Sequence, residues 1–253
     1  MIIISENNLI LLLLVTALWQ CEKPVSEEIV NFADEDLLEA IIKQGVDLNK
    51  DGYISYSEAA AVSHLMIFNA GVEDLGGLEV FINLDSLILK MLPLEEMDLS
   101  GNPGLKYLEC SICDLKFVDL SGNMVLEEIS CETNQIETLV LPESDVLKML
   151  RCGYNRIREL DVSGNPGLVT LGCNNNYLSS LDLSNNLQLT RMISCGNQLT
   201  TLDVSRNTKI TTLGIDNMPT LTEVCVWTLP FPPEGVRVLM DYSPNVVFVV
   251  ECS

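Results

Sequence analysis

The feature that most limits the fold of this 253-residue chain is a motif that returns every 21 residues. LKMLRCGYNRIRELDVSGNPG begins at Leu147, and LVTLGCNNNYLSSLDLSNNLQ begins at Leu168. Each unit reads LxxLxCxxNx followed by LxxLDLSxNxx, so it contains two short segments of alternating side chains. One such unit cannot bury its own leucines, and units of this kind therefore stack and share a core. The repeat predicts a solenoid.

The repeated units extend over residues 62–230. They begin at Val62, Leu84, Leu105, Leu126, Leu147, Leu168, Leu189 and Ile210. Because strand side chains alternate, Leu168, Leu171, Cys173 and Leu178 point inward. A half-unit of about eleven residues that also turns leaves no room for a helix. We therefore expect eight coils that form a right-handed solenoid of the α/β class, mostly β, with two parallel sheets. A C-terminal capping segment should follow over residues 231–253.

Asparagines and cysteines recur at fixed places in the first half of the unit. The asparagines are Asn134, Asn155, Asn176 and Asn197, and Cys113 takes their place in the coil that starts at Leu105. An inward amide can satisfy backbone groups of its own turn and of the next coil. The cysteines are Cys110, Cys131, Cys152 and Cys173. We expect these thiols to be reduced and to fill the core. Near the C-terminus, Cys225 and Cys252 are candidates for a disulfide.

An aspartate recurs in the second half of most units. These residues are Asp98, Asp119, Asp161, Asp182 and Asp203. Stacked carboxylates could bind cations or act as glycosidase acids. Val140 interrupts the ladder, however, and a dedicated ion site would tolerate that poorly. We expect each aspartate to accept hydrogen bonds from the turn that follows it.

Residues 47–58, DLNKDGYISYSE, match the complete pattern of a twelve-residue calcium loop. The expected oxygen ligands are Asp47, Asn49, Asp51, Tyr53, Ser55 and Glu58, with Gly52 at the sharp turn. Helical spacing over residues 33–45 and a second short helix after the loop predict an EF-hand-like unit over residues 29–61. Since the hand is single and precedes an open solenoid end, we expect calcium to fasten a small helical cap.

The first 20 residues contain an apolar run from Leu9 to Trp19 that has the length of a signal-peptide core. Cys21 follows, as in the lipid-modified site of bacterial lipoproteins, although Gln20 stands where a small residue is usual. We expect export, acylation of Cys21 and a short tether over residues 21–28. An ordinary cleaved signal is the alternative.

The composition restricts the core and the partners. Hydrophobic residues make up 47% of the chain but aromatic residues only 6%, so the core has to be aliphatic. The net charge of −22 repels phosphate backbones, and nucleic acid is excluded as an expected partner. The same charge suits divalent cations and basic partners, with simple solubility as the alternative reading.

The leader, the single calcium loop, GLEVFINL (residues 77–84) and the 21-residue units together resemble a group of bacterial leucine-rich-repeat surface proteins, often lipoproteins, with internalins as more distant relatives. The resemblance implies display at the cell envelope, with an outer-membrane lipoprotein as the expected form. It also implies binding of a protein or glycan without catalysis, and we expect the chain to be a monomer. No serine elbow, phosphate loop or zinc signature occurs in the sequence.

The two halves of the unit differ in how much their outward residues vary. In the second half the outward residues are nearly uniform, as coil folding demands, whereas in the first half they vary freely. We therefore expect the binding site on the first-half strands, which leucine-rich repeats usually make concave. Its expected residues are Tyr107, Glu109, Glu128, Glu132, Met149, Arg151 and Arg191. A structural envelope protein without a dedicated ligand and a carbohydrate-capture module are the alternatives.

Overall fold

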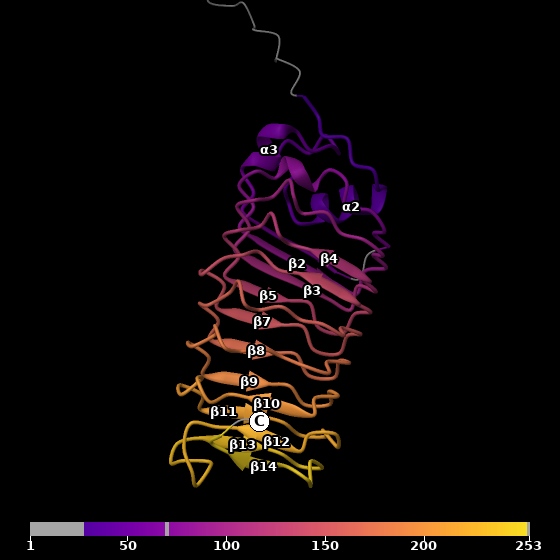
Figure 1. The fold of residues 1–253 in the computed structure, drawn as a ribbon. Helices are drawn as coiled ribbons and strands as arrows, with labels where there is room; N and C mark the ends of the chain where they lie inside the picture. Colours follow the sequence, from indigo (N-terminus) through magenta and orange to yellow (C-terminus); the bar gives the residue numbers. More distant parts are fainter. Residues whose placement is uncertain (1–27, 69–70, 252–253) are drawn as a thin grey trace, which may run out of the picture.

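The computed structural model describes residues 28–68 and 71–251, in which stacked coils build one long parallel sheet (Figure 1). In spatial order its nine strands are β1 (His64–Phe68), β2 (Ser86–Lys90), β3 (Tyr107–Ser111), β5 (Glu128–Ser130), β7 (Met149–Arg151), β8 (Thr170–Gly172), β9 (Arg191–Ile193), β11 (Thr212–Gly214) and β13 (Arg237–Leu239). The predicted leader and Cys21 lie outside the described residues.

The repeat of the sequence sets the register of this sheet. Tyr107 pairs with Glu128, which pairs in turn with Met149, and each partner lies 21 residues further along the chain. The same register continues through Thr170 and Arg191. Equivalent side chains of successive coils therefore stand in straight rows across the strands.

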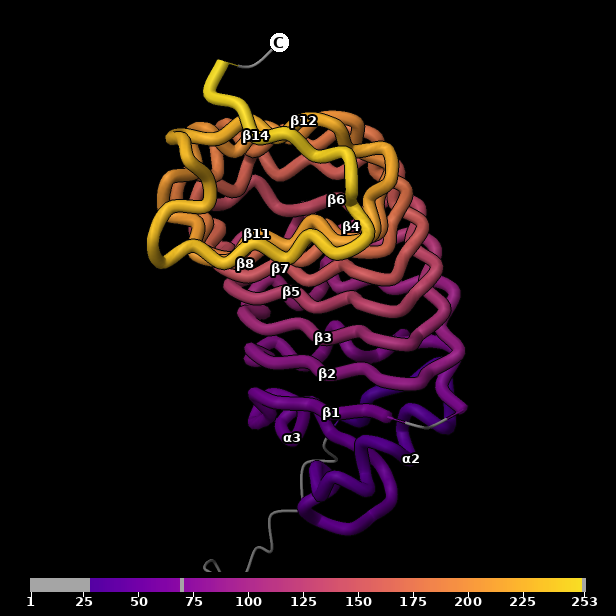
Figure 2. The backbone as a smooth tube through the Cα atoms, turned by 90° about the horizontal axis from the view of Figure 1, so that it is seen from below, coloured from indigo at the N-terminus to yellow at the C-terminus, as the bar shows by residue number. Residues whose placement is uncertain are grey.

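The opposite side of the solenoid carries two smaller parallel sheets. One pairs β4 (Phe117–Asp119) with β6 (Thr138–Val140), and the other joins β10 (Thr201–Asp203), β12 (Glu223–Cys225) and β14 (Val247–Val249). Figure 2 shows β12 and β14 across the coil from β11. We expected one continuous second sheet, but residues 159–163 and 180–184 form no strand. Each second half has only about three extended residues between two turns, so its ladder is short and easily interrupted.

The solenoid has one more coil than the eight counted in the sequence. The ninth strand of the long sheet, β13, comes from the segment expected to be a cap, and its Arg237 pairs with Thr212. The segment between β11 and β13 carries four prolines and is longer than 21 residues, which hides the repeat. Cys225 is disulfide-bonded. Cys252, its expected partner, lies outside the described residues.

The core is aliphatic, as the composition predicts. Leu168, Leu171, Cys173 and Leu178, the inward residues of one unit, are all fully buried. At the C-terminal end, aromatic rings cover the last coils instead. Phe231 lies 5.3 Å from Trp227 and 4.9 Å from Phe248 between ring centroids.

Two short helices precede the first coil. Helix α2 (Glu35–Lys43) is capped by Asp34, which accepts a hydrogen bond from the amide of Asp36 at 2.8 Å. Helix α3 (Tyr56–Ala60) begins at a capping box and ends at Ala60, because the chain enters β1 four residues later. One 3-10 turn, η1 (Leu78–Val80), lies in the first coil. Across residues 28–68 and 71–251, no helix is long and apolar enough to cross a membrane.

Candidate functional site

The seven residues expected to form a binding face all lie on the long sheet or directly beside it. Tyr107, Glu128 and Met149 form one row, and Glu109 and Arg151 belong to a second row in which Ser130 stands between them. Arg191 continues the first row beyond Thr170. Glu132 lies two residues after the end of β5. The sheet therefore brings five of these residues onto three adjacent strands, with Glu132 just beyond the middle strand and Arg191 two strands away.

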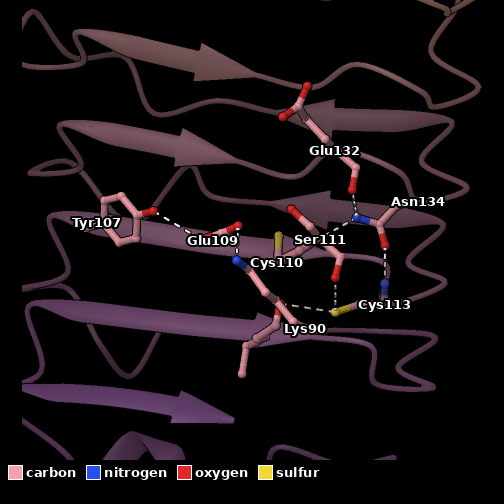
Figure 3. A network of polar contacts seen from close by, with 9 residues as sticks. Lys90, Tyr107, Glu109, Cys110, Ser111, Cys113, Glu132 and Asn134 are labelled. Atoms are coloured by element: carbon pink, nitrogen blue, oxygen red, sulfur yellow. Dashed lines mark hydrogen bonds and ion pairs between the residues drawn. The ribbon is translucent and has the colours of Figure 1, made fainter. Parts of the chain in front are cut away.

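A small polar network fixes the side chains at the N-terminal part of this face. Glu109 forms an ion pair with Lys90 at 2.7 Å and accepts a hydrogen bond from the Tyr107 hydroxyl at 3.2 Å (Figure 3). Burial raises the pKa of Tyr107, and the negative charges of Glu109 and Glu128 raise it further. The phenol therefore stays protonated and remains a hydrogen-bond donor at neutral pH.

The other charged residues of the face form no ion pair among the described residues. Arg151 and Arg191 are exposed, and neither has an ion-pair partner among residues 28–68 and 71–251. Glu128 and Glu132 are half-buried and likewise lack an ion pair in this part of the chain. Four charges are thus available to an external partner.

The asparagine ladder holds the turns at the edge of the face. Asn134 donates to the Cys110 carbonyl of the preceding coil at 2.7 Å and accepts from the amide of Cys113 at 2.8 Å (Figure 3). The thiol of Cys113 makes the corresponding contact with the Leu89 carbonyl at 3.5 Å. The predicted role of the ladder is confirmed, and its bonds reach the preceding coil rather than the following one.

A second ladder of buried asparagines closes the other turn of each coil, and we did not predict it. Its members are Asn102, Asn123, Asn165, Asn186 and Asn207. The amide of Asn123 donates to the carbonyls of Leu99 and Asn102, and the other members repeat this pattern. The signal was the final asparagine of LDLSxN in the repeated unit.

The cysteines of the ladder are reduced and part of the core, as predicted. Cys110, Cys131, Cys152 and Cys173 are free and fully buried. Burial raises the pKa of Cys131 to about 12 and that of Cys173 to about 12. These thiols are therefore neutral at physiological pH and are not nucleophiles.

The aspartate ladder stabilises turns, which confirms the prediction. Each of its five carboxylates accepts a hydrogen bond from the serine amide two residues later, at 2.8–2.9 Å. The hydrogen bond from the Ser100 amide lowers the pKa of Asp98, for example. The uniform outward residues of the second half thus have a structural use, which leaves the varied sheet as the candidate site.

The twelve-residue loop has its acidic side chains turned toward its own backbone. Glu58 is 6% exposed; its Oε1 accepts from the amide of Leu48 at 2.8 Å, and its Oε2 accepts from the amide of Ser55 at 2.9 Å. These bonds, led by the one from Ser55, lower the pKa of Glu58. Asp47 accepts from Gly52 at 3.0 Å. In the described part of the chain, no three His, Cys, Asp or Glu side chains are gathered closely enough to hold a metal ion.

The donor set of the loop nevertheless suits calcium. Six oxygen-bearing residues lie within twelve positions, and calcium prefers such oxygen ligands. A carboxylate oxygen has two lone pairs, so the Gly52 bond leaves Asp47 able to bind an ion as well. Asp51 accepts from Tyr53 in the same way, at 2.9 Å.

A segment that precedes the loop in the chain pairs with its second half. Ile29 and Ser55 form an antiparallel bridge, and the Val30 amide donates to the Ile54 carbonyl at 2.8 Å. Ile54 is fully buried. The single loop is therefore braced by the chain that leads into it.

The stacked coils, the parallel sheet and the repeated inward leucines and asparagines define a leucine-rich-repeat solenoid of about nine turns. Several solved structures share this fold. The functional domain of InlJ from Listeria monocytogenes, which includes a cysteine ladder, is 23% identical, with a TM-score of 0.56 over 83% of this chain and 60% of that one. A leucine-rich-repeat protein from Leptospira interrogans is 17% identical, with a TM-score of 0.60 over 78% of this chain and 58% of that one.

A third similar structure is internalin C2 from Listeria monocytogenes, which is 18% identical, with a TM-score of 0.52 over 86% of this chain and 94% of that one. The present chain spans about three fifths of the length of the first two structures. No family model matches the sequence. No curated protein matches it either. The similarities confirm the leucine-rich-repeat fold expected from the sequence.

Proposed function

We propose that this protein is a binding module that recognises another protein through the outward face of its nine-stranded sheet. The observation that carries the proposal is the contrast between the two sides of each coil. The outward Asp and Ser residues of the second half form hydrogen bonds with each other within the turns. On the sheet, Glu128, Arg151 and Arg191 vary from coil to coil and have no ion-pair partner among the described residues.

A protein partner fits this face better than a glycan. Sugar rings stack on exposed aromatic side chains, and the one aromatic residue in the two central rows, Tyr107, is half-buried and bonded to Glu109. Alternating apolar and charged side chains such as Met149 and Arg151 are typical of protein interfaces. That the similar structures include internalins supports the same choice.

We further propose that the chain is exported and anchored to the cell envelope through an acylated Cys21. The disulfide at Cys225 supports this location, because disulfides persist in oxidising compartments. The apolar leader and the position of Cys21 directly after it provide the remaining support.

Calcium is proposed as the ion of the loop at residues 47–58. Asp47, Asn49, Asp51 and Glu58 would supply side-chain oxygens, and Tyr53 its carbonyl. The loop is flanked by α2 and α3, and α2 packs on β1 at the start of the solenoid. Binding there would stabilise the helices that cover the first coil. Its expected role is structural.

Affinity capture with matched variants tests the binding proposal. The mature chain is immobilised and exposed to surface and envelope proteins of its natural surroundings. A variant changed to alanine at Tyr107, Glu128, Met149 and Arg151 should lose the captured partner. A control changed at four exposed residues of the opposite side, Phe117, Glu137, Glu159 and Thr201, should retain it. Equal capture by both variants would exclude the sheet face as the binding site.

A further inference from the structure

A row of left-handed residues borders the sheet face, directly after the first strand of each coil. Its members, all with φ between 51° and 66°, are Met91, Ile112, Thr133, Tyr154, Asn175, Gly196, Asn217 and Tyr242. Backbone bonds connect neighbours along the row. The Ile112 amide donates to the Thr133 carbonyl at 3.1 Å, and the Met91 amide donates to the Ser111 carbonyl beside Ile112 at 3.3 Å.

The residue types in this row change along the solenoid. Asn175, Gly196 and Asn217 suit a left-handed backbone, because glycine lacks a Cβ and asparagine tolerates the region. Ile112 and Thr133 are β-branched, and for such residues the region is a genuine outlier. The turn itself is the same in every coil, so its geometry does not require isoleucine, methionine or tyrosine.

The unfavourable residues also expose their apolar side chains. Met91 is 50% exposed, Ile112 53% and Tyr154 57%. Phe68, which is 57% exposed, extends the line, since it pairs with Lys90 next to Met91. We name Phe68, Met91, Ile112 and Tyr154 the apolar ridge. About half of each side chain is exposed, and the turn does not require these residue types, which points to contact with another molecule.

Phe68, Met91 and Ile112 of the ridge lie in the strongly acidic part of the chain, and Tyr154 lies just beyond it. Residues 1–148 hold 27 acidic and 7 basic residues and no arginine, whereas residues 149–253 hold 9 acidic and 7 basic residues. Glu132 stands one position before Thr133, which lies between Ile112 and Tyr154 in the left-handed row, and Glu128 begins the strand that precedes it. Neither carboxylate has an ion-pair partner in the described ranges.

We infer that the apolar ridge, with Glu132 next to it and Glu128 at the start of the adjoining strand, docks a basic segment of the partner protein that carries aliphatic or aromatic side chains. Apolar side chains of the segment would cover Met91 and Ile112, and its lysines or arginines would pair with the two glutamates. Complementary charge selects such a segment, and the apolar contacts retain it. The inference rests on the proposed function and specifies the chemistry of the partner.

A peptide selection tests this inference without knowledge of the natural partner. Random peptides displayed on phage are selected on the immobilised chain, and enriched sequences are synthesised for affinity measurement. We expect enrichment of peptides with net positive charge and several aliphatic or aromatic residues. Ile112→Asn should weaken their binding about tenfold, and Glu128→Gln with Glu132→Gln should weaken it by a similar factor.

Two control variants match these changes on the opposite side of the same coils. Phe117→Asn removes an equally exposed apolar side chain, and Glu137→Gln removes an exposed carboxylate. Both should leave the affinity unchanged. Enrichment of acidic or uncharged peptides that still depend on the sheet residues would overturn the inference but leave the proposed function intact. Absence of enrichment, or peptides that bind every variant alike, would overturn both.

Discussion

The side-chain amide of Asn155 donates to the carbonyl of Cys131 in the preceding coil at 2.9 Å, and this bond joins two coils through their buried interior. The same amide group reaches the Cys152 carbonyl at 3.1 Å, while its oxygen accepts from the Ile136 amide at 3.0 Å. Several backbone groups that water cannot reach thus depend on one side chain.

Asn155→Ala should therefore lower the free energy of unfolding by about 2–4 kcal/mol, because buried carbonyl and amide groups lose their partner. Asn185→Ala is the control, since Asn185 is exposed and makes one bond, to the Ser163 carbonyl at 3.3 Å. Its effect should stay within about 0.5 kcal/mol. Urea denaturation measures both variants. Equal losses of stability would contradict the stabilising role of the asparagine ladder.

Ile112→Asn should stabilise the protein by about 1 kcal/mol, because asparagine adopts the left-handed backbone at lower cost than a β-branched residue. The same substitution at the exposed strand residue Phe117 should give no gain. Thermal or urea denaturation of the two variants provides the comparison. A loss of stability in Ile112→Asn would mean that this side chain supports the fold and is not reserved for a partner.

The buried thiols should resist alkylation while the protein is folded. Burial holds the pKa of Cys131 and of Cys173 at about 12, so almost no thiolate is present at pH 8. Iodoacetamide followed by mass spectrometry should label both residues only in denaturant. Modification of Cys131 in the native protein at the rate of an exposed thiol would contradict the buried ladder.

The same thiols make stability depend on alkaline pH. Their folded pKa lies above the ordinary value of 9.0, so the folded state favours the protonated thiol. This contribution is fully present below pH 9 and is lost as the pH rises toward about 12. Between pH 9 and about 12, the denaturation midpoint should fall less in Cys131→Ala than in the unchanged chain. Each protein is compared with its own midpoint at neutral pH, because the variant starts from a lower stability.

Calcium should raise the melting temperature, and Glu58→Gln should remove that increase. An ion present at a hundred times its dissociation constant stabilises a folded state by about 2.7 kcal/mol. Glu137→Gln, which removes an exposed carboxylate far from the loop in sequence, should keep the full response. A melting temperature that is the same with calcium and with a chelator would exclude the structural role proposed for the ion.

The repeat made most of the architecture predictable, because a fixed spacing becomes a fixed register once coils stack. Leu171 and Cys173 are buried and Asp161 caps its turn, as their positions in the unit indicate. The ninth coil could not be found in this way, since the proline-rich connection before β13 breaks the spacing. The interruption of the second sheet could not be predicted from the sequence either.

The candidate site was predictable only in part. The outward rows followed from alternation, and Tyr107 and Met149 stand where that pattern places them. The apolar ridge did not follow, because methionine, isoleucine and tyrosine give no sign of a left-handed backbone. Asn175 and Gly196 carried the only signal, in register with Ile112 and Tyr154.

Hydroxyl-radical footprinting of the captured complex tests the central claim most directly. Met91 and Met149 lie on or beside the sheet face, whereas the exposed Met124 follows a strand of the opposite side. If the sheet face binds the partner, oxidation of Met91 and Met149 should fall in the complex and that of Met124 should stay constant. Protection of Met124, with Met91 and Met149 oxidised as in the free protein, would contradict the account.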